Sequence, residues 1–171
     1  MMLIGIGANL PGADGASPLE TCRRAVMRLD SLQNVRLAAL SRWYSSDPVP
    51  PSSQPVYINA IAALTVEPGA TEPDPAELLA WLQGIEADAG RLRSVPNAAR
   101  TLDLDIVAMG PAGQMMRASP DPVLPHPRMH LRAFVLVPLL DVAPRWVHPV
   151  LRRPAGELLA ALPQQNVVLL N

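Results

Sequence analysis

Two aspartates separated by a single residue are the most chemically informative feature of this sequence of 171 residues. Asp103 and Asp105 lie in the segment TLDLDIVAM, whose alternating pattern predicts a β-strand over 101–109. Residues two apart in a strand point to the same face, so both carboxylates share one face while the intervening leucines face the core. Such a pair is suited to Mg²⁺, which takes one or two carboxylates and completes its coordination with water and phosphate oxygens. A solvated outer face on an edge strand is the alternative interpretation.

Arginines cluster immediately before the aspartate pair. Arg91, Arg93 and Arg100 fall within ten residues, in a segment of Ser, Pro, Asn and Ala. Guanidinium groups beside metal-binding carboxylates favour a polyphosphate substrate, because they neutralise the charge that develops during phosphoryl transfer. All fourteen basic residues are arginine, and the lack of lysine excludes a Walker A loop and a Schiff-base lysine. Without the aspartates, the same arginines would be interpreted as solvated surface.

Two other motifs are weaker signals. His126 is held between two prolines, which makes it rigid and suited to contacting a ligand, whereas three histidines in all argue against a zinc site. Gly5, Gly7 and Asn9 follow the pattern of a phosphate loop only in part. They lack the third glycine and the helix start of a dinucleotide-binding fingerprint.

The elements that position these residues follow a regular order. Strands are predicted over 2–8, 35–45, 57–66 and 101–109, helices over 17–32, 74–89 and 132–141, and a short helix (156–161) and strand (167–170) at the end. Ser17 and Asp74, each followed by proline, predict helix N-caps. The order β-α-β-β-α-β matches the ferredoxin-like unit. The sequence therefore predicts an α+β sandwich with extra C-terminal elements.

Composition limits the class of protein. With 49% hydrophobic and 17% charged residues, the chain has material for one packed domain, expected to span 1–171. A net charge of −1 and 4% aromatic residues argue against a nucleic-acid partner. The single cysteine, Cys22, excludes an intramolecular disulfide. No apolar run reaches about 18 residues and no basic segment precedes one, so we expect neither a membrane partner nor a signal peptide, but a cytoplasmic monomer.

Taken together, the segments resemble the 6-hydroxymethyl-7,8-dihydropterin pyrophosphokinase family. The matching pieces, in order, are IGIGANL, QPVYIN, IEADAGRLR, ARTLDLDI and LPHPRMHLRAFVLVPLLDVAP, which span nearly the whole chain. The LDLD strand followed by PHPRM and the R-x-F pattern is the specific combination. The resemblance implies a ferredoxin-like αβα sandwich that transfers pyrophosphate from ATP to the pterin and releases AMP, in folate biosynthesis, with two Mg²⁺ ions and no protein nucleophile.

The resemblance also implies individual roles. Asp103 and Asp105 correspond to the magnesium ligands and, with Arg91 and Arg100, to the catalytic residues. The implied ATP-binding residues are Gln83, Glu86, Arg91, Arg93, Arg100, Ile106, His126 and Arg132. The implied pterin-binding residues are Ser46, Asp47, Val49, Tyr57, Asn59 and Phe134, with Phe134 stacking on the ring and Asn59 reading its edge. Residues 94–99 lack the tryptophan of the family, so few ligand contacts are expected there.

Two other functions fit parts of the sequence. One is a ferredoxin-like binding module without catalysis, which has no use for paired strand carboxylates. The other is a different Mg²⁺-dependent phosphoryl or nucleotidyl transferase on the same scaffold. Whether AMP or ADP accumulates from ATP, Mg²⁺ and the pterin distinguishes these possibilities.

Overall fold

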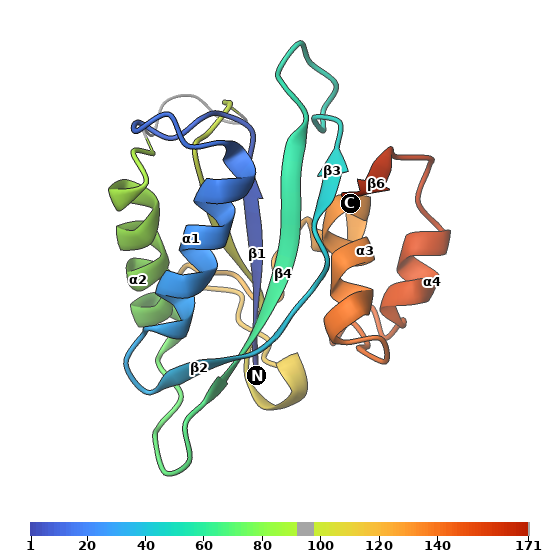
Figure 1. Cartoon of the computed structure of the whole chain (residues 1–171). Helices are drawn as coiled ribbons and strands as arrows, with labels where there is room; N and C mark the ends of the chain where they lie inside the picture. The colour runs from blue at the N-terminus through green and yellow to red at the C-terminus, as the bar shows by residue number, and fades with distance from the viewer. Residues whose placement is uncertain (92–97, 171) are drawn as a thin grey trace.

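One sheet lies between two pairs of helices in the computed structural model of the chain, which describes residues 1–91 and 98–170 (Figure 1). The strands are β1 (Met2–Ala8), β2 (Val35–Leu40), β3 (Tyr44–Ser46), β4 (Tyr57–Val66), β5 (Asp103–Ala108) and β6 (Val167–Leu169). The helices are α1 (Pro18–Asp30), α2 (Pro75–Asp88), α3 (Ala133–Val142) and α4 (Ala155–Ala160), with two 3₁₀ turns, η1 (Pro111–Gly113) and η2 (Met129–Leu131). The predicted mixture of helices and strands is confirmed. Among the described residues, no helix has the length and apolar character needed to span a membrane.

The sheet is antiparallel, with the strand order β5-β1-β4-β3-β6. β4 is its longest strand and pairs with β1 along one side. Along the other side it pairs with β2 and then with β3. β5, which carries the aspartate pair, is therefore a terminal strand of the sheet.

The prediction of one continuous strand over 35–45 is wrong, because residues 41–43 separate β2 from β3. At this break the Ser41 amide donates to the Ile61 carbonyl, and the Ser41 hydroxyl accepts from the Ile61 amide, both at 2.9 Å. A side chain thus replaces a backbone partner of β4. Arg42 is drawn toward α3, where its Nη2 lies 2.6 Å from Oδ1 of Asp141. These two sets of contacts interrupt the strand in a way that its apolar pattern does not reveal.

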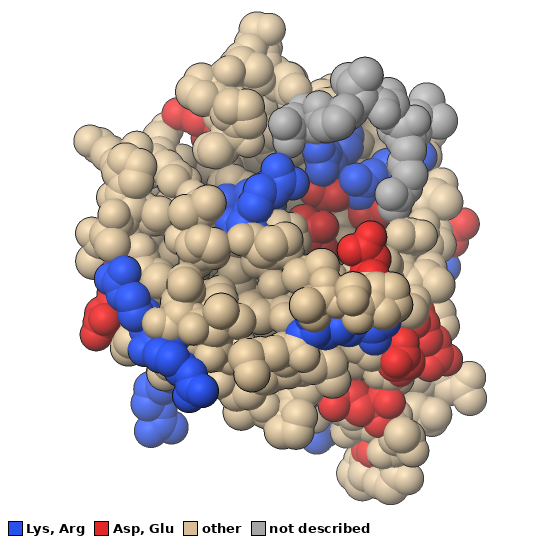
Figure 2. All heavy atoms as spheres, turned by 180° about the vertical axis from the view of Figure 1, so that it is seen from behind, with Lys and Arg blue, Asp and Glu red and all other residues tan. Residues whose placement is uncertain are grey.

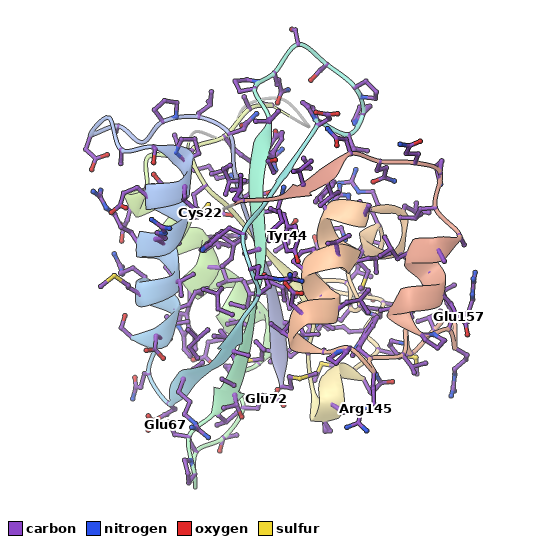
Figure 3. All side chains as sticks on the ribbon, turned by 45° about the vertical axis from the view of Figure 1, so that its right-hand side comes forward. Cys22, Tyr44, Glu67, Glu72, Arg145 and Glu157 are labelled. Carbon is purple, nitrogen blue, oxygen red and sulfur yellow. The ribbon has the colours of Figure 1, made fainter. Side chains whose placement is uncertain are left out.

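Each face of the sheet has its own core, and Figure 3 shows side chains filling the space on both sides. The core under α1 and α2 includes Ile4, Ile6, Cys22, Leu29, Leu82, Leu104 and Ile106. The core under α3 and α4 includes Leu3, Ile61, Val107, Leu136 and Leu158. The alternation of strand residues between the two cores is the period-two pattern seen in the sequence. It sends Asp103 and Asp105 to the α3 face.

The helix ends agree with the predicted capping. Ser17 Oγ accepts from the Glu20 amide at 3.2 Å, and Asp74 Oδ1 accepts from the Ala76 amide at 2.8 Å. Gly90 follows α2 with φ +78°, a conformation that glycine adopts without strain. The turn at Gly90 directs Arg91 back toward β5.

Candidate active site

Three neighbouring strands form the floor of a cavity of about 550 Å³ on the α3 side of the sheet. Across the sheet, one row contains Asn59, Gly7 and Asp103, and the next contains Ile61, Gly5 and Asp105. A Cβ atom on Gly7 would lie 3.8 Å from Oδ1 of Asn59 and 3.9 Å from Cβ of Asp103. The glycines therefore keep the floor low between Asn59 and the carboxylates. Neighbouring strands lie about 4.8 Å apart, so the side chains of Asn59 and Asp103, two strands apart, start about 10 Å from each other.

The cavity has charges of both signs. Figure 2 shows acidic residues in the hollow and basic residues on its rim. The acidic and basic residues that line it, in the described part of the chain, are Asp47, Arg91, Arg100, Asp103, Asp105, His126, Arg128 and Arg132. Such a lining suits a polyanionic substrate that arrives with cations.

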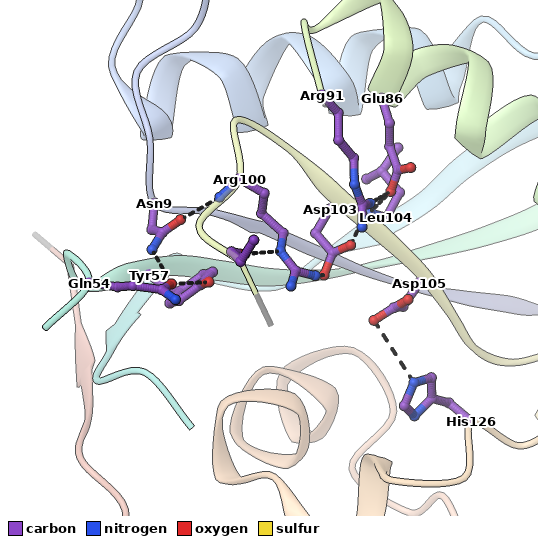
Figure 4. Close-up of polar contacts among 11 residues, drawn as sticks. Asn9, Gln54, Tyr57, Glu86, Arg91, Arg100, Asp103, Leu104, Asp105 and His126 are labelled. Atoms are coloured by element: carbon purple, nitrogen blue, oxygen red, sulfur yellow. Dashed lines mark hydrogen bonds and ion pairs between the residues drawn. The ribbon is translucent and has the colours of Figure 1, made fainter. Parts of the chain in front are cut away.

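Asp103 is held between two arginines (Figure 4). Its Oδ1 lies 2.6 Å from Arg91 Nη1 and its Oδ2 lies 2.5 Å from Arg100 Nη1. All three side chains are between 17% and 20% exposed, so the pairs are only partly hydrated. Two arginines of the predicted polyphosphate-binding cluster, Arg91 and Arg100, thus converge on the first aspartate of the pair.

Glu86 ties α2 to β5 beneath this cluster. Its carboxylate accepts from the Leu104 amide at 2.7 Å and also pairs with Arg91. The side chain is almost completely buried. Gln83, one turn earlier on α2, is exposed and does not line the cavity. Glu86 therefore positions Arg91 and the aspartate strand.

Asp105 faces the cavity beside His126, with Oδ2 4.0 Å from Nε2. The Arg128 amide donates to His126 Nδ1 at 3.1 Å, which leaves the proton of the neutral ring on Nε2. Burial, with a further effect of Asp103, raises the pKa of Asp105 to about 6. Burial and two nearby arginines lower the pKa of His126 to about 4. His126 is thus a neutral donor at physiological pH.

The residues predicted to read the pterin gather around Asn59. Its Nδ2 donates to Ser46 Oγ at 2.9 Å and to the Tyr57 carbonyl at 3.3 Å, which fixes the orientation of the amide. Asp47, Val49, Tyr57 and Phe134 line the cavity, whereas Ser46 is buried behind Asn59. The Arg132 guanidinium lies over the face of the Phe134 ring, 5.5 Å from the ring centroid. A flat heteroaromatic ring and an amide-like edge match an aromatic side chain and a fixed amide.

Asn9 connects the two ends of the site. Its Oδ1 accepts from the Arg100 amide at 2.8 Å, and its Nδ2 donates to the Pro55 carbonyl at 3.2 Å and to Gln54 Oε1 at 3.3 Å. Tyr57 donates to the same Gln54 oxygen at 2.9 Å. One buried side chain therefore links the arginine segment to the loop before β4 (Figure 4).

The structure places most of the predicted site residues together. The predicted residues that line the cavity are Asp47, Val49, Tyr57, Asn59, Arg91, Arg100, Asp103, Asp105, His126, Arg132 and Phe134. Ile106 points its side chain away from the cavity, into the core under α1 and α2. Arg93 and residues 94–97 of the segment expected to make few ligand contacts lie outside the described residues. The other two residues of that segment, Ala98 and Ala99, line the cavity.

The cavity residues that sequence reasoning did not assign to the site include Gly5, Gly7, Gln54 and Arg128. The two glycines had a detectable signal, since they alternate with Ile4 and Ile6 and so belong to the face opposite the core under α1 and α2. Arg128 lies in the PHPRM motif but had no pattern to distinguish it from surface arginines. Its role depends on the path of the chain after β5.

The chemistry of the aspartate pair fits a hard divalent cation. Asp103 and Asp105 present carboxylate oxygens to the cavity from one strand face. Among the described residues, no group of three or more His, Cys, Asp or Glu side chains is arranged to hold a metal ion. A cation here would rely on one or two carboxylates and on oxygens of the substrate, which is how Mg²⁺ binds with phosphates.

Carboxylates and arginines that meet in one cavity beside two aromatic side chains have the chemistry that a phosphotransferase uses. Residues 3–144 match the family model described as 7,8-dihydro-6-hydroxymethylpterin-pyrophosphokinase. A 2-amino-4-hydroxy-6-hydroxymethyldihydropteridine pyrophosphokinase of Pseudomonas aeruginosa is 39% identical over 168 residues, which covers 96% of this chain and 93% of that protein. The protein of the same name from Haemophilus influenzae is 37% identical and covers 85% of this chain and 83% of its own.

A solved structure shares the fold. HPPK-DHPS of Plasmodium falciparum aligns with a TM-score of 0.63 at 11% identity, over 93% of this chain and 40% of that one, so this chain spans less than half of that protein. The family match and the two bacterial relatives decide the assignment. The chain belongs to the 7,8-dihydro-6-hydroxymethylpterin-pyrophosphokinase family.

Proposed function

We propose that this cavity carries out the reaction of the family, the transfer of pyrophosphate from ATP to 6-hydroxymethyl-7,8-dihydropterin with release of AMP in folate biosynthesis. The activity expected from the sequence is confirmed by the family match and by the bacterial relatives. The observation that carries its placement is the row Asn59–Gly7–Asp103, in which a pterin-reading amide and a phosphate-side carboxylate face each other across a glycine.

The two substrates occupy opposite ends of this row. The pterin lies against Asn59, Tyr57 and Phe134, so that its hydroxymethyl group extends over the glycines. The triphosphate lies on the Asp103 side, where Arg91 and Arg100 already converge. The hydroxymethyl oxygen forms a bond to the β-phosphorus and loses its proton to water. The bond from that phosphorus to the α-bridging oxygen breaks, and AMP leaves with that oxygen.

The arginines neutralise the charge that spreads over the phosphoryl oxygens, and no side chain forms a covalent intermediate. Asp103 and Asp105 would hold two Mg²⁺ ions, which when bound supply charge neutralisation and orient the phosphate chain. His126, neutral with its proton on Nε2, donates toward the phosphates. Asn9 fixes the position of Arg100 relative to the loop that precedes β4, through its hydrogen bonds to the Arg100 amide and the Pro55 carbonyl.

The same proposal covers the fold and its setting. The sheet is ferredoxin-like when β2 and β3 together count as one strand next to β4, with β6 added beyond β3. The two cores share this sheet, which supports one domain over residues 1–171. Cys22 is a buried free thiol, in keeping with an enzyme of the reducing cytoplasm, and the proposal takes that enzyme to be a monomer.

Incubation of the protein with ATP, Mg²⁺ and 6-hydroxymethyl-7,8-dihydropterin tests the reaction. AMP and the pterin pyrophosphate should accumulate in equal amounts, because the whole β,γ-pyrophosphoryl group is transferred. Accumulation of ADP would show transfer of a single phosphoryl group instead. If neither product forms, the cavity does not have this activity.

A further inference from the structure

Arg128 and Arg132 differ from the other described arginines of the cavity, because they have no carboxylate partner in the described part of the chain. Arg91 and Arg100 are both ion-paired to Asp103. Arg128 and Arg132 also line the cavity, yet within residues 1–91 and 98–170 neither forms an ion pair with a carboxylate. Arg132 has only the face of the Phe134 ring against its guanidinium. This side of the cavity therefore presents two positive charges that no described carboxylate contacts directly, while Asp105 and Asp103 attract Arg132 from a longer distance.

The chain holds these arginines at the two ends of one short turn. Arg128 precedes η2 and Arg132 follows it. The Arg128 amide donates to His126 Nδ1 at 3.1 Å, and the Arg132 amide donates to the Met129 carbonyl at 3.2 Å. Met129 between them is fully buried, which anchors the turn. Both side chains are thus directed into the same cavity by a fixed backbone segment.

The positive charges of Arg128 and Arg132 repel each other in the absence of a ligand. Burial lowers the pKa of Arg132, and the charge of Arg128 lowers it further. An anion bound between the two guanidinium groups would remove this repulsion. Guanidinium groups bind phosphate oxygens through paired hydrogen bonds, so a phosphate chain is the anion that fits an enzyme using ATP.

We propose that Arg128 is a further substrate-binding residue of this enzyme, which contacts the polyphosphate chain of ATP together with Arg132 on the η2 side of the cavity. The inference rests on the proposed function and adds a residue to it. It predicts that the contribution of Arg128 depends on the number of phosphates in the nucleotide and on positive charge at this position.

The test compares Arg128→Gln, Arg128→Lys and a matched control, Arg36→Gln, which removes an exposed arginine from β2 outside the cavity. Each is titrated with a non-hydrolysable ATP analogue in Mg²⁺ and with AMP. Arg128→Gln should weaken binding of the analogue by about tenfold, the order expected for one charge-assisted contact. Binding of AMP should change much less, Arg128→Lys should recover most of the affinity, and Arg36→Gln should match the wild type.

Melting without nucleotide provides an independent readout. Arg128→Gln should leave the melting temperature unchanged or raise it, because it removes repulsion. A large fall in the melting temperature, unchanged affinity for the analogue, or an equal loss for AMP and the analogue would each overturn the inference. Failure of the wild type to release AMP would refute the proposed function instead, since the titrations do not depend on turnover.

Discussion

Replacement of Asp105 by asparagine should stabilise the metal-free protein while removing its activity. The carboxylate is desolvated and lies beside Asp103, and its pKa rises from 3.8 to about 6. Each pKa unit corresponds to about 1.4 kcal/mol, which sets an upper limit of about 3 kcal/mol. Because the side chain is 44% exposed to the cavity, solvent screens part of this cost, and we expect a gain of about 1 kcal/mol.

Asp103→Asn is the matched comparison, with the opposite expectation for stability. Asp103 holds both Arg91 and Arg100 in a partly buried cluster. Removal of its charge leaves two guanidinium groups without that partner, and it should destabilise the protein by about 1 to 3 kcal/mol. Both variants should release AMP at least 100-fold more slowly in saturating Mg²⁺, the order found when charge stabilisation of a transition state is lost.

Urea unfolding in EDTA between pH 4 and pH 7.5 measures the stability difference. The folded pKa of Asp105 is raised, so ionised Asp105 costs stability above about pH 6, and this cost disappears as the pH falls toward 3.8. The advantage of Asp105→Asn should therefore be present at pH 7 and vanish near pH 4. A variant less stable than the wild type at pH 7, an advantage independent of pH, or near-normal AMP release would refute the reasoning.

Three further predictions concern the floor, the loops and the core. Gly5→Val should retain the fold but lose more than tenfold in AMP release, because its Cβ, 3.3 Å from Val107 Cγ2, adds side-chain volume to the cavity floor; circular dichroism melting and product assays measure the two effects. Asn9→Ala should cost about 1 to 3 kcal/mol in urea unfolding and raise the KM for ATP, because it leaves the Arg100 amide and the Pro55 carbonyl without their partner. Burial raises the pKa of Cys22 to about 12, so the native thiol should resist a thiol reagent at pH 8. Above pH 9 the thiol ionises in the unfolded chain but not in the folded one, so the free energy of unfolding should fall with pH more steeply in the wild type than in Cys22→Ala, by about 1.4 kcal/mol per pH unit.

Local chemistry in the sequence was sufficient for most of the elements and for the carboxylate pair of the site. The caps at Ser17 and Asp74 depend on neighbouring residues only, and they form as predicted. The alternation around Asp103 and Asp105 depends on the period of a strand, so the shared face of the two carboxylates also followed from sequence alone. The family resemblance rested on motifs of this local kind.

Only the tertiary structure decided what those residues face. The aspartate strand is a terminal strand, as the alternative interpretation required, but the segment around η2 and α3 covers its polar face and turns a surface into a cavity. The break at Ser41 and the burial of Glu86 depend on partners about twenty residues away, Ile61 and Leu104, which no local pattern specifies. Arg128 and Gly7 acquire their roles for the same reason. Their chemistry is set by which strand or turn lies across the cavity, and strand register and chain path are properties of the folded whole.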